Sequence, residues 1–221
     1  MKASAHPDSR RLARIGANVR GRLDRQPGAR RLGNGKAEIY ALDTFLDAGE
    51  CAHLIGLIDA LAQPSRVLDE EQWPDYRTSC SSDLHRDDAC VQAIEKRLCD
   101  LTGIASACSE AVQGQRYESG QYFNEHCDWF DTEASYWARE SGCGGQRSWT
   151  AMVYLNAVEK GGATDFTRMC LSVTPQPGAL LLWNNAMPDG SPNPWTMHAA
   201  RPVLRGTKYV VTKWFRARTW Q

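Results

Sequence analysis

Hydrophobic positions divide the chain into a first part with helical spacing and a second part made of short strand-like runs. In the first part, apolar residues recur every three or four positions in two stretches, 47–63 and 88–101. Asp47 and Glu50 have the spacing of a capping box, which predicts the start of the first helix. Gly103 is typical of a residue that ends a helix, here the second one.

From about residue 111 the pattern changes to short apolar runs separated by turns rich in Gly, Pro, Asn and Asp. The expected strands are residues 111–117, 121–125, 149–155, 170–174, 178–183, 196–203 and 207–216. Helices followed by strands predict an α+β fold. We expect a jelly-roll core (a double-stranded β-helix) with the N-terminal helices packed on one of its sheets.

The first 36 residues differ from the rest in charge. They contain ten lysine and arginine residues and two aspartates, a net charge of +8 in a chain whose formal net charge is zero. Leu12, Ile15, Val19 and Leu23 recur at helical spacing, but several glycines disfavour an isolated helix. We therefore expect a flexible basic tail, with binding to nucleic acid or to an acidic partner as the alternative. A transit peptide is a third option, which Asp8, Asp24 and the scarcity of serine disfavour.

These patterns predict three regions: the tail over residues 1–36, a helical part over 37–110 and a jelly-roll core over 111–217. No apolar run is long enough for a membrane span or a signal peptide, so we expect a cytoplasmic protein without a membrane partner. The eight cysteines include no CxxC pair, which favours reduced thiols over a zinc ribbon or a thioredoxin motif.

The triplet His126-Cys127-Asp128 is the strongest chemical signal. Residues two apart on an extended segment point to the same side, so its imidazole and carboxylate can reach one metal ion. The triplet His85-Arg86-Asp87 has the same spacing but precedes a predicted helix, where aspartate serves as an N-cap. We interpret this second triplet as structural.

His198 lies in a later extended segment and is the candidate third ligand. Two histidines and one carboxylate form the facial triad of non-haem Fe(II) oxygenases, which leaves coordination positions open. Lys208 follows ten residues later, beyond a predicted turn at Arg205-Gly206, so two antiparallel strands can bring both side chains into one cavity. A buried ammonium group needs an anion, and the carboxylate of a co-substrate would supply one.

These residues belong to an ordered series of short segments. In chain order the segments are Arg116-Tyr117-x-x-Gly120-Gln121, His126-x-Asp128, Gln146-Arg147, Thr150-x-x-x-Tyr154-Leu155-Asn156, Glu159-x-Gly161-Gly162-x-Thr164-x-Phe166, Pro177-Gly178, Leu181-Leu182-Trp183-Asn184, Asp189-Gly190, His198-Ala199, Pro202-Val203, Gly206-x-Lys208 and Thr212-Lys213-Trp214. Together they resemble the catalytic domain of prolyl 4-hydroxylase-type Fe(II)/2-oxoglutarate dioxygenases.

The resemblance implies a role for each matched residue. It implies that His126, Asp128 and His198 bind Fe(II). It also implies that the distal carboxylate of 2-oxoglutarate pairs with Lys208 and accepts hydrogen bonds from Tyr117 and Thr150. The implied enzyme uses dioxygen, releases succinate and CO2, hydroxylates a C–H bond and is supported by L-ascorbate.

On the substrate side, the resemblance implies Arg147, Trp214 and Phe123, the last at a position where the family usually has tyrosine. The expected substrate is a prolyl residue of a protein or peptide. The same chemistry on another side chain or on a small metabolite, and a non-catalytic binding module, are the alternatives. Residues 132–145 are expected to form a mobile loop over the mouth of the site, or else a plain surface hairpin. Nucleic acid is expected, if at all, only at the tail.

Overall fold

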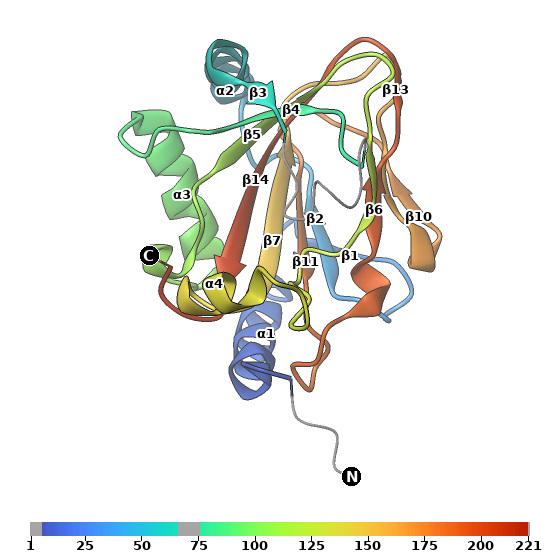
Figure 1. Cartoon of the computed structure of the whole chain (residues 1–221). Coiled ribbons are helices and arrows are strands. Elements are labelled where there is room, and N and C mark those ends of the chain that lie inside the picture. Colours follow the sequence, from blue (N-terminus) through green and yellow to red (C-terminus); the bar gives the residue numbers. More distant parts are fainter. Residues whose placement is uncertain (1–5, 66–75, 221) are drawn as a thin grey trace.

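The computed structural model describes residues 6–65 and 76–220. An eight-stranded antiparallel sheet forms the centre of the molecule (Figure 1). Its strands in spatial order are β1 (Arg30–Leu32), β2 (Ile39–Leu42), β11 (Leu180–Asn184), β7 (Arg147–Tyr154), β14 (Lys208–Arg216), β5 (Gln113–Tyr117), β4 (Cys80–Asp83) and β3 (Gln63–Pro64). A four-stranded sheet faces it, in the order β10 (Leu171–Val173), β9 (Thr164–Phe166), β12 (His198–Ala200) and β6 (Phe123–His126), and β13 (Val203–Arg205) pairs with β8 (Lys160–Gly161).

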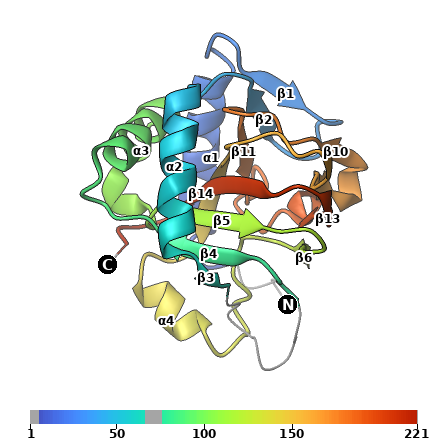
Figure 2. The same cartoon turned by 90° about the horizontal axis from the view of Figure 1, so that it is seen from above.

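The helices are α1 (Ser9–Leu23), α2 (Ala48–Leu61), α3 (Ala89–Thr102) and the short α4 (Trp137–Gly142), with 3-10 turns η1 (Ser106–Cys108), η2 (Thr167–Met169) and η3 (Pro194–Thr196). Helices α1, α2 and α3 lie on one side of the large sheet, and the small sheet lies on the other (Figure 2). This arrangement confirms the expected α+β jelly roll with its N-terminal helices on one sheet. Each of the seven strand segments predicted after residue 110 contains a strand, whereas the short β8 and β9 were not predicted.

Two hydrophobic cores follow from the alternation of side chains along β7. Trp149, Ala151 and Val153 pack with the helices on one face of the large sheet. Met152 and Tyr154 belong to a second core on the opposite face. The space between the two sheets therefore has its own apolar lining.

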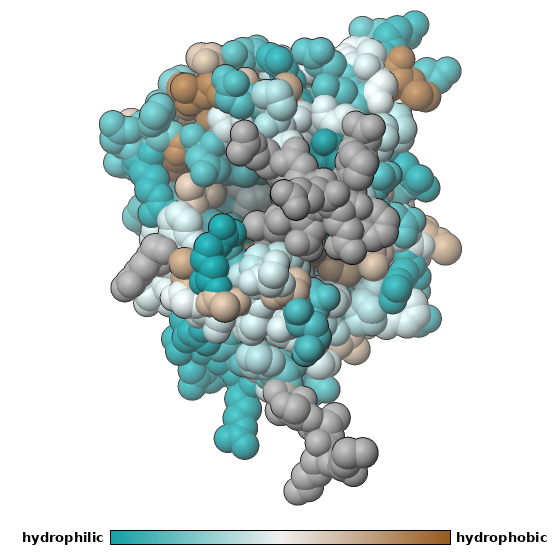
Figure 3. All heavy atoms as spheres, viewed as in Figure 1, coloured by the Kyte–Doolittle hydropathy of each residue, from teal (hydrophilic) through white to brown (hydrophobic). Residues whose placement is uncertain are grey.

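The polar and charged side chains lie mostly outside these cores. Figure 3 shows a largely hydrophilic face with only scattered hydrophobic residues. Among the described residues, Leu204 is the large hydrophobic side chain that stands out as exposed, at 60%. No helix in the described part of the chain is both long and apolar enough to cross a membrane.

The predicted ends of α2 and α3 are confirmed. Asp47 accepts a hydrogen bond from the backbone N–H of Glu50 at 2.8 Å, and the Glu50 carboxylate accepts one from the N–H of Asp47 at 3.0 Å. Asp88 caps the start of α3, and Gly103 ends that helix with a φ of 72°. Both termini thus follow from local sequence.

The flexible tail that the sequence predicts is wrong for residues 9–23, which form α1. Leu12, Gly16, Val19 and Leu23 form the buried stripe of this helix. A Cβ atom on Gly16 would lie 2.7 Å from the side-chain nitrogen of Asn184, so only glycine allows this close approach. The glycine that disfavours an isolated helix is therefore a contact point once the helix packs on the large sheet.

Candidate metal centre and co-substrate pocket

The structure brings the three predicted metal ligands together between the two sheets. His198 on β12 is paired in register with His126 on β6, and Asp128 follows two residues after His126. One ligand atom from each of these residues lies within 4.8 Å of the other two. The His198 Nε2 and Asp128 Oδ2 atoms are 3.9 Å apart. Pairing of the two strands thus brings together residues that are about seventy positions apart in the sequence.

Backbone carbonyls fix the orientation of both imidazoles. His126 Nδ1 lies 2.7 Å from the carbonyl oxygen of Asn124, and His198 Nδ1 lies 2.9 Å from that of Thr196. Because a carbonyl only accepts hydrogen bonds, each Nδ1 carries a proton, and Nε2 is the ring nitrogen that can bind a metal ion. Burial, with the neighbouring His198, lowers the pKa of His126 to about 3 and holds that ring in the neutral form that binds metals.

The carboxylate of Asp128 is fixed by a chain of two hydrogen bonds. Thr150 Oγ1 donates to Asp128 Oδ2 at 2.7 Å, and Asn185 Nδ2 donates to Thr150 Oγ1 at 2.9 Å. The sequence predicts that Thr150 donates to 2-oxoglutarate; here its hydroxyl donates to Asp128, and a bond to the co-substrate stays a prediction. Asn185, which completes the chain, was not identified from the sequence.

The donor set fits a divalent iron ion. Two imidazole Nε2 atoms and one oriented carboxylate offer three ligands on one side, the facial arrangement that leaves positions open for small molecules. The rings of Phe166 and Trp183 pack near His198, with centroids 5.7 and 4.9 Å away, and shield the cluster from water.

The side chain of Lys208 ends between the two sheets, on the same side of the large sheet as this cluster. The side chain is fully buried, and its Nζ lies 3.4 Å from the hydroxyl of Thr164 and about 5 Å from the ring centres of Tyr117 and Tyr154 (5.3 and 5.5 Å). Within the described part of the chain, no carboxylate oxygen lies within 4.0 Å of this nitrogen. Burial lowers the pKa of Lys208 to about 7, and the charge of Asp165 offsets this only in part. An anion bound beside Lys208 would raise this pKa again and keep the side chain positively charged.

The aromatic residues around Lys208 only partly match the prediction. The ring of Tyr117 borders the pocket as expected, but its hydroxyl donates to Gln115 Oε1 at 3.0 Å rather than toward Lys208. Thr164 and Tyr154, which sequence reasoning did not assign, complete the lining. Both occur in the ordered segments of the resemblance, which is the signal that could have identified them.

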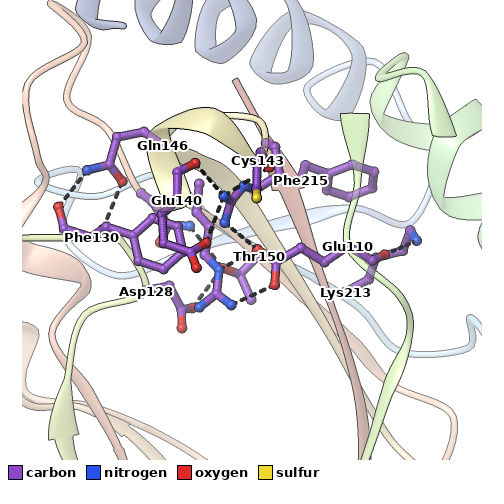
Figure 4. Close-up of polar contacts among 12 residues, drawn as sticks. Glu110, Asp128, Phe130, Glu140, Cys143, Gln146, Thr150, Lys213 and Phe215 are labelled. Carbon is purple, nitrogen blue, oxygen red and sulfur yellow. Dashed lines mark hydrogen bonds and ion pairs between the residues drawn. The ribbon is translucent and has the colours of Figure 1, made fainter. Parts of the chain in front are cut away.

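Arg147 and Trp214, both predicted on the substrate side, lie together near the metal cluster. The guanidinium of Arg147 donates to both carboxylate oxygens of Glu110 at 2.7 Å and lies 4.1 Å from the ring centre of Trp214. Glu110 also accepts a hydrogen bond from Arg216 at 2.9 Å. Figure 4 shows this network beside Asp128 and Thr150. Arg147 is thus held in place by the partly buried carboxylate of Glu110, which the sequence did not reveal.

The segment 132–145 contains helix α4 and is anchored at its end. Arg216 Nη2 donates to the side chain and backbone oxygens of Glu140 at 2.9 and 3.0 Å, and to the carbonyl of Cys143 at 3.2 Å. Gln146 holds the other side by bonding both the N–H and the carbonyl of Phe130, at 2.8 and 2.6 Å. The segment is therefore neither a plain hairpin nor free at its C-terminal end, and its closing over the site stays a prediction.

Phe123 covers one imidazole of the cluster. Its ring stacks on that of His126 with centroids 3.6 Å apart and planes 15° from parallel. The guanidinium of Arg77 lies 4.9 Å from the centre of the same ring. Phe123 therefore contacts the candidate metal site directly, while its contact with substrate stays a prediction.

Comparison with known proteins agrees with this geometry. A sequence model of the 2OG-Fe(II) oxygenase superfamily matches residues 112–216, so the chain is an enzyme of the class that uses Fe(II) and 2-oxoglutarate. Prolyl 4-hydroxylase 2 of Arabidopsis thaliana is 34% identical over 205 residues, which cover 81% of this chain and 67% of that protein. Probable prolyl 4-hydroxylase 3 of the same plant is 33% identical over 199 residues, or 79% and 68% of the two chains.

A solved structure is also similar: the viral collagen prolyl hydroxylase of Paramecium bursaria Chlorella virus-1 in complex with 2-oxoglutarate. It aligns with a TM-score of 0.63 and 28% identity, covering 80% of this chain and 95% of that one. The chain belongs to the prolyl 4-hydroxylase family of 2OG-Fe(II) oxygenases.

Proposed function

We propose that this enzyme hydroxylates a prolyl residue in a protein or peptide, with Fe(II) held by His126, Asp128 and His198 and 2-oxoglutarate held by Lys208. The observation that carries the proposal is the fully buried Lys208, whose ammonium group has, among the described residues, one hydroxyl (that of Thr164) within hydrogen-bonding distance and lies between the same two sheets as the three ligand atoms. A buried cation of this kind is costly unless an anion joins it. A dicarboxylate that also reaches the metal meets both requirements.

Each group of side chains has a distinct task in this site. When bound, the iron supplies dioxygen chemistry that couples decarboxylation of 2-oxoglutarate to hydroxylation of a C–H bond. Lys208 and Thr164 bind the distal carboxylate and so set the direction from which 2-oxoglutarate approaches the metal. Thr150 keeps Asp128 in one orientation and accepts a hydrogen bond from Asn185.

The substrate class is supported by the relatives and by apolar side chains near the metal cluster. The similar proteins named above are prolyl hydroxylases. Phe123 and Trp214 offer apolar surfaces near the metal cluster, and a pyrrolidine ring can pack against such surfaces.

Substitution of a ligand tests the iron assignment. His198→Ala should abolish Fe(II)-dependent release of CO2 from 2-oxoglutarate, because two ligands do not hold the metal in the required geometry. His85→Ala is the matched control, since His85 belongs to the other HxD triplet, is exposed and lies outside the cavity. Unchanged turnover in His198→Ala would rule out this iron site.

The substrate is tested separately. A panel of proline-containing peptides is incubated with the enzyme, Fe(II), 2-oxoglutarate and ascorbate and is analysed by mass spectrometry with fragmentation. Addition of one oxygen atom to a proline is the expected result. Decarboxylation without any peptide product, or oxygen on another side chain, would overturn the prolyl assignment while leaving the iron chemistry intact.

A further inference from the structure

A second cluster of metal-binding side chains lies on the helical side of the large sheet, outside the jelly-roll cavity. It consists of His53 on α2, the N-cap residue Asp88 of α3 and Cys90 in the first turn of α3. One ligand atom from each residue lies within 4.8 Å of the other two, and the His53 Nε2 and Asp88 Oδ2 atoms are 2.9 Å apart. Figure 2 shows α2 and α3 on the side of the sheet away from β6. The Fe(II) site and this cluster are thus separated by the large sheet.

The start of α3 holds two of these three side chains in place. One oxygen of Asp88 accepts hydrogen bonds from the backbone N–H groups of Cys90 and Val91, at 2.9 and 3.0 Å. This cap fixes the carboxylate and leaves its other oxygen directed at His53. The same helical turn brings the Cys90 side chain to the contact between α2 and α3. The cluster is therefore preorganised by the helix and not by chance encounters of exposed side chains.

The types of donor atom distinguish this cluster from the Fe(II) site. An imidazole nitrogen, a carboxylate oxygen and a thiolate sulfur are all ligands of Zn²⁺, at about 2.0 to 2.3 Å from the ion. Tetrahedral geometry at those bond lengths separates the ligand atoms by about 3.3 to 3.6 Å. The hydrogen-bonded pair of His53 and Asp88 would open slightly to admit the ion, and Cys90 would move closer. The His53 side chain is 47% exposed, so water can occupy the fourth position.

The surrounding charge also favours a cation. Asp47 and Glu50 lie close enough to act on the Cys90 thiol, and Glu50 forms an ion pair with Arg97. Burial first, and then the charges of Glu50 and Asp88, raise the pKa of Cys90. A metal ion must therefore displace a proton from the thiol, which relieves the repulsion that the negative neighbours would exert on a free thiolate.

We propose that His53, Asp88 and Cys90 form a second metal site, of the Zn²⁺ type, that joins the start of α3 to the middle of α2. The site is independent of the Fe(II) centre and of the proposed reaction. Its three ligands come from two helices, so the bound ion cross-links the helical layer that supports the large sheet. The remaining open position makes it a three-ligand site with one bound water.

Co²⁺ is the probe for this site, because a thiolate bound to Co²⁺ gives a charge-transfer absorption that nitrogen and oxygen ligands do not give. The full-length chain carrying His198→Ala, which removes the Fe(II) site, is freed of metal and titrated with Co²⁺ under reducing conditions. We expect the absorption to saturate at one Co²⁺ per chain and to disappear when Zn²⁺ is added. Adding His53→Ala should weaken Co²⁺ binding by roughly tenfold or more, and Cys90→Ser should remove the absorption.

Cys170→Ser is the matched control, because Cys170 is an exposed cysteine outside the cluster and its loss should leave the titration unchanged. His53 is half exposed on a helix, so its replacement by alanine leaves the fold intact. Absence of the charge-transfer absorption in the parent chain would overturn the proposal. So would an absorption that survives both His53→Ala and Cys90→Ser, since the thiolate would then lie elsewhere.

Discussion

Replacement of Lys208 by methionine should stabilise the protein and weaken its binding of 2-oxoglutarate. In the absence of a co-substrate the ammonium group is buried without a carboxylate within 4.0 Å among the described residues. Its pKa is lowered from the ordinary 10.5 to about 7. The difference of about 3.5 pH units corresponds to about 5 kcal/mol, at about 1.4 kcal/mol per unit. Lys208→Met removes this cost, and part of the gain is lost because the Thr164 hydroxyl then lacks its partner.

We therefore expect Lys208→Met to raise the free energy of unfolding by about 2 to 4 kcal/mol at pH 7, measured by urea denaturation without 2-oxoglutarate. The sign of the pH dependence follows from proton counts. Between pH 7 and 10.5 the unfolded chain keeps the lysine proton and the native chain does not, so the parent protein gains stability as pH rises. The advantage of the variant should be constant below pH 7 and shrink above it.

Lys208→Met should weaken the binding of 2-oxoglutarate, although it stabilises the protein. Loss of a buried charge pair costs about 2 to 5 kcal/mol, so the affinity for 2-oxoglutarate should fall by at least about thirtyfold. Anaerobic calorimetry with Mn²⁺ in place of iron measures this without turnover. In the parent enzyme the affinity should also decrease as pH rises above 7, because binding then requires a proton on Lys208.

Lys213 is the matched control on the same strand. It is as buried as Lys208, but it forms an ion pair with Glu95 and donates to the carbonyl of Glu110 at 2.7 Å. Lys213→Met leaves Glu95 unpaired and should destabilise the protein by about 3 to 5 kcal/mol without changing 2-oxoglutarate affinity. If Lys208→Met instead destabilised the protein to the same degree, or bound 2-oxoglutarate normally, the assignment of an anion pocket to Lys208 would be refuted.

Three further substitutions test the surroundings of the cavity. Thr150→Val removes the hydrogen bond to Asp128 and should weaken Fe(II) binding by about 10- to 100-fold, measured as the iron concentration that supports half-maximal CO2 release; equal iron affinity would contradict the assigned role. Glu110→Gln deprives the fully buried Arg216 and the partly buried Arg147 of their carboxylate and should cost about 3 to 5 kcal/mol in urea denaturation. Although burial alone would raise it, the arginines hold the pKa of Glu110 below its ordinary 4.5, so the stabilisation is present above pH 4.5 and is lost as pH falls below it. Phe123→Tyr should change the KM for the peptide and leave the KM for 2-oxoglutarate unchanged. A change in the KM for 2-oxoglutarate would contradict the placement of Phe123 on the substrate side of the metal.

Features that depend on local sequence were predictable. The capping box at Asp47 and the period of two in His126-x-Asp128 are set by neighbouring residues, and both have the expected geometry. His198 was found because it lies in an extended segment that can pair with the first one. Prediction of the metal cluster therefore required only these local patterns and the pairing of two strands.

Hydrogen-bond partners were less predictable, because they depend on residues that are distant in the chain. Thr150 lies on β7, but its hydrogen bonds to Asp128 and Asn185 join residues that are 22 and 35 positions away in the sequence. The orientation of the Tyr117 hydroxyl likewise depends on Gln115, two residues before it on β5. A side chain can therefore be assigned to a cavity from its strand position, while its partner cannot.

Helix α1 is part of the chain that the enzyme needs in order to fold. The sequence match to the superfamily begins at residue 112, yet Leu12, Val19 and Leu23 are almost fully buried against the rest of the molecule. Burial of three such side chains contributes on the order of 5 kcal/mol, which is comparable to the whole stability of a typical domain. Asp8, just before the helix, also pairs with Arg218 near the other end of the chain. A shortened protein that starts at Ala37 would keep every proposed catalytic residue, but it would lose the stabilisation that α1 provides and should not fold stably.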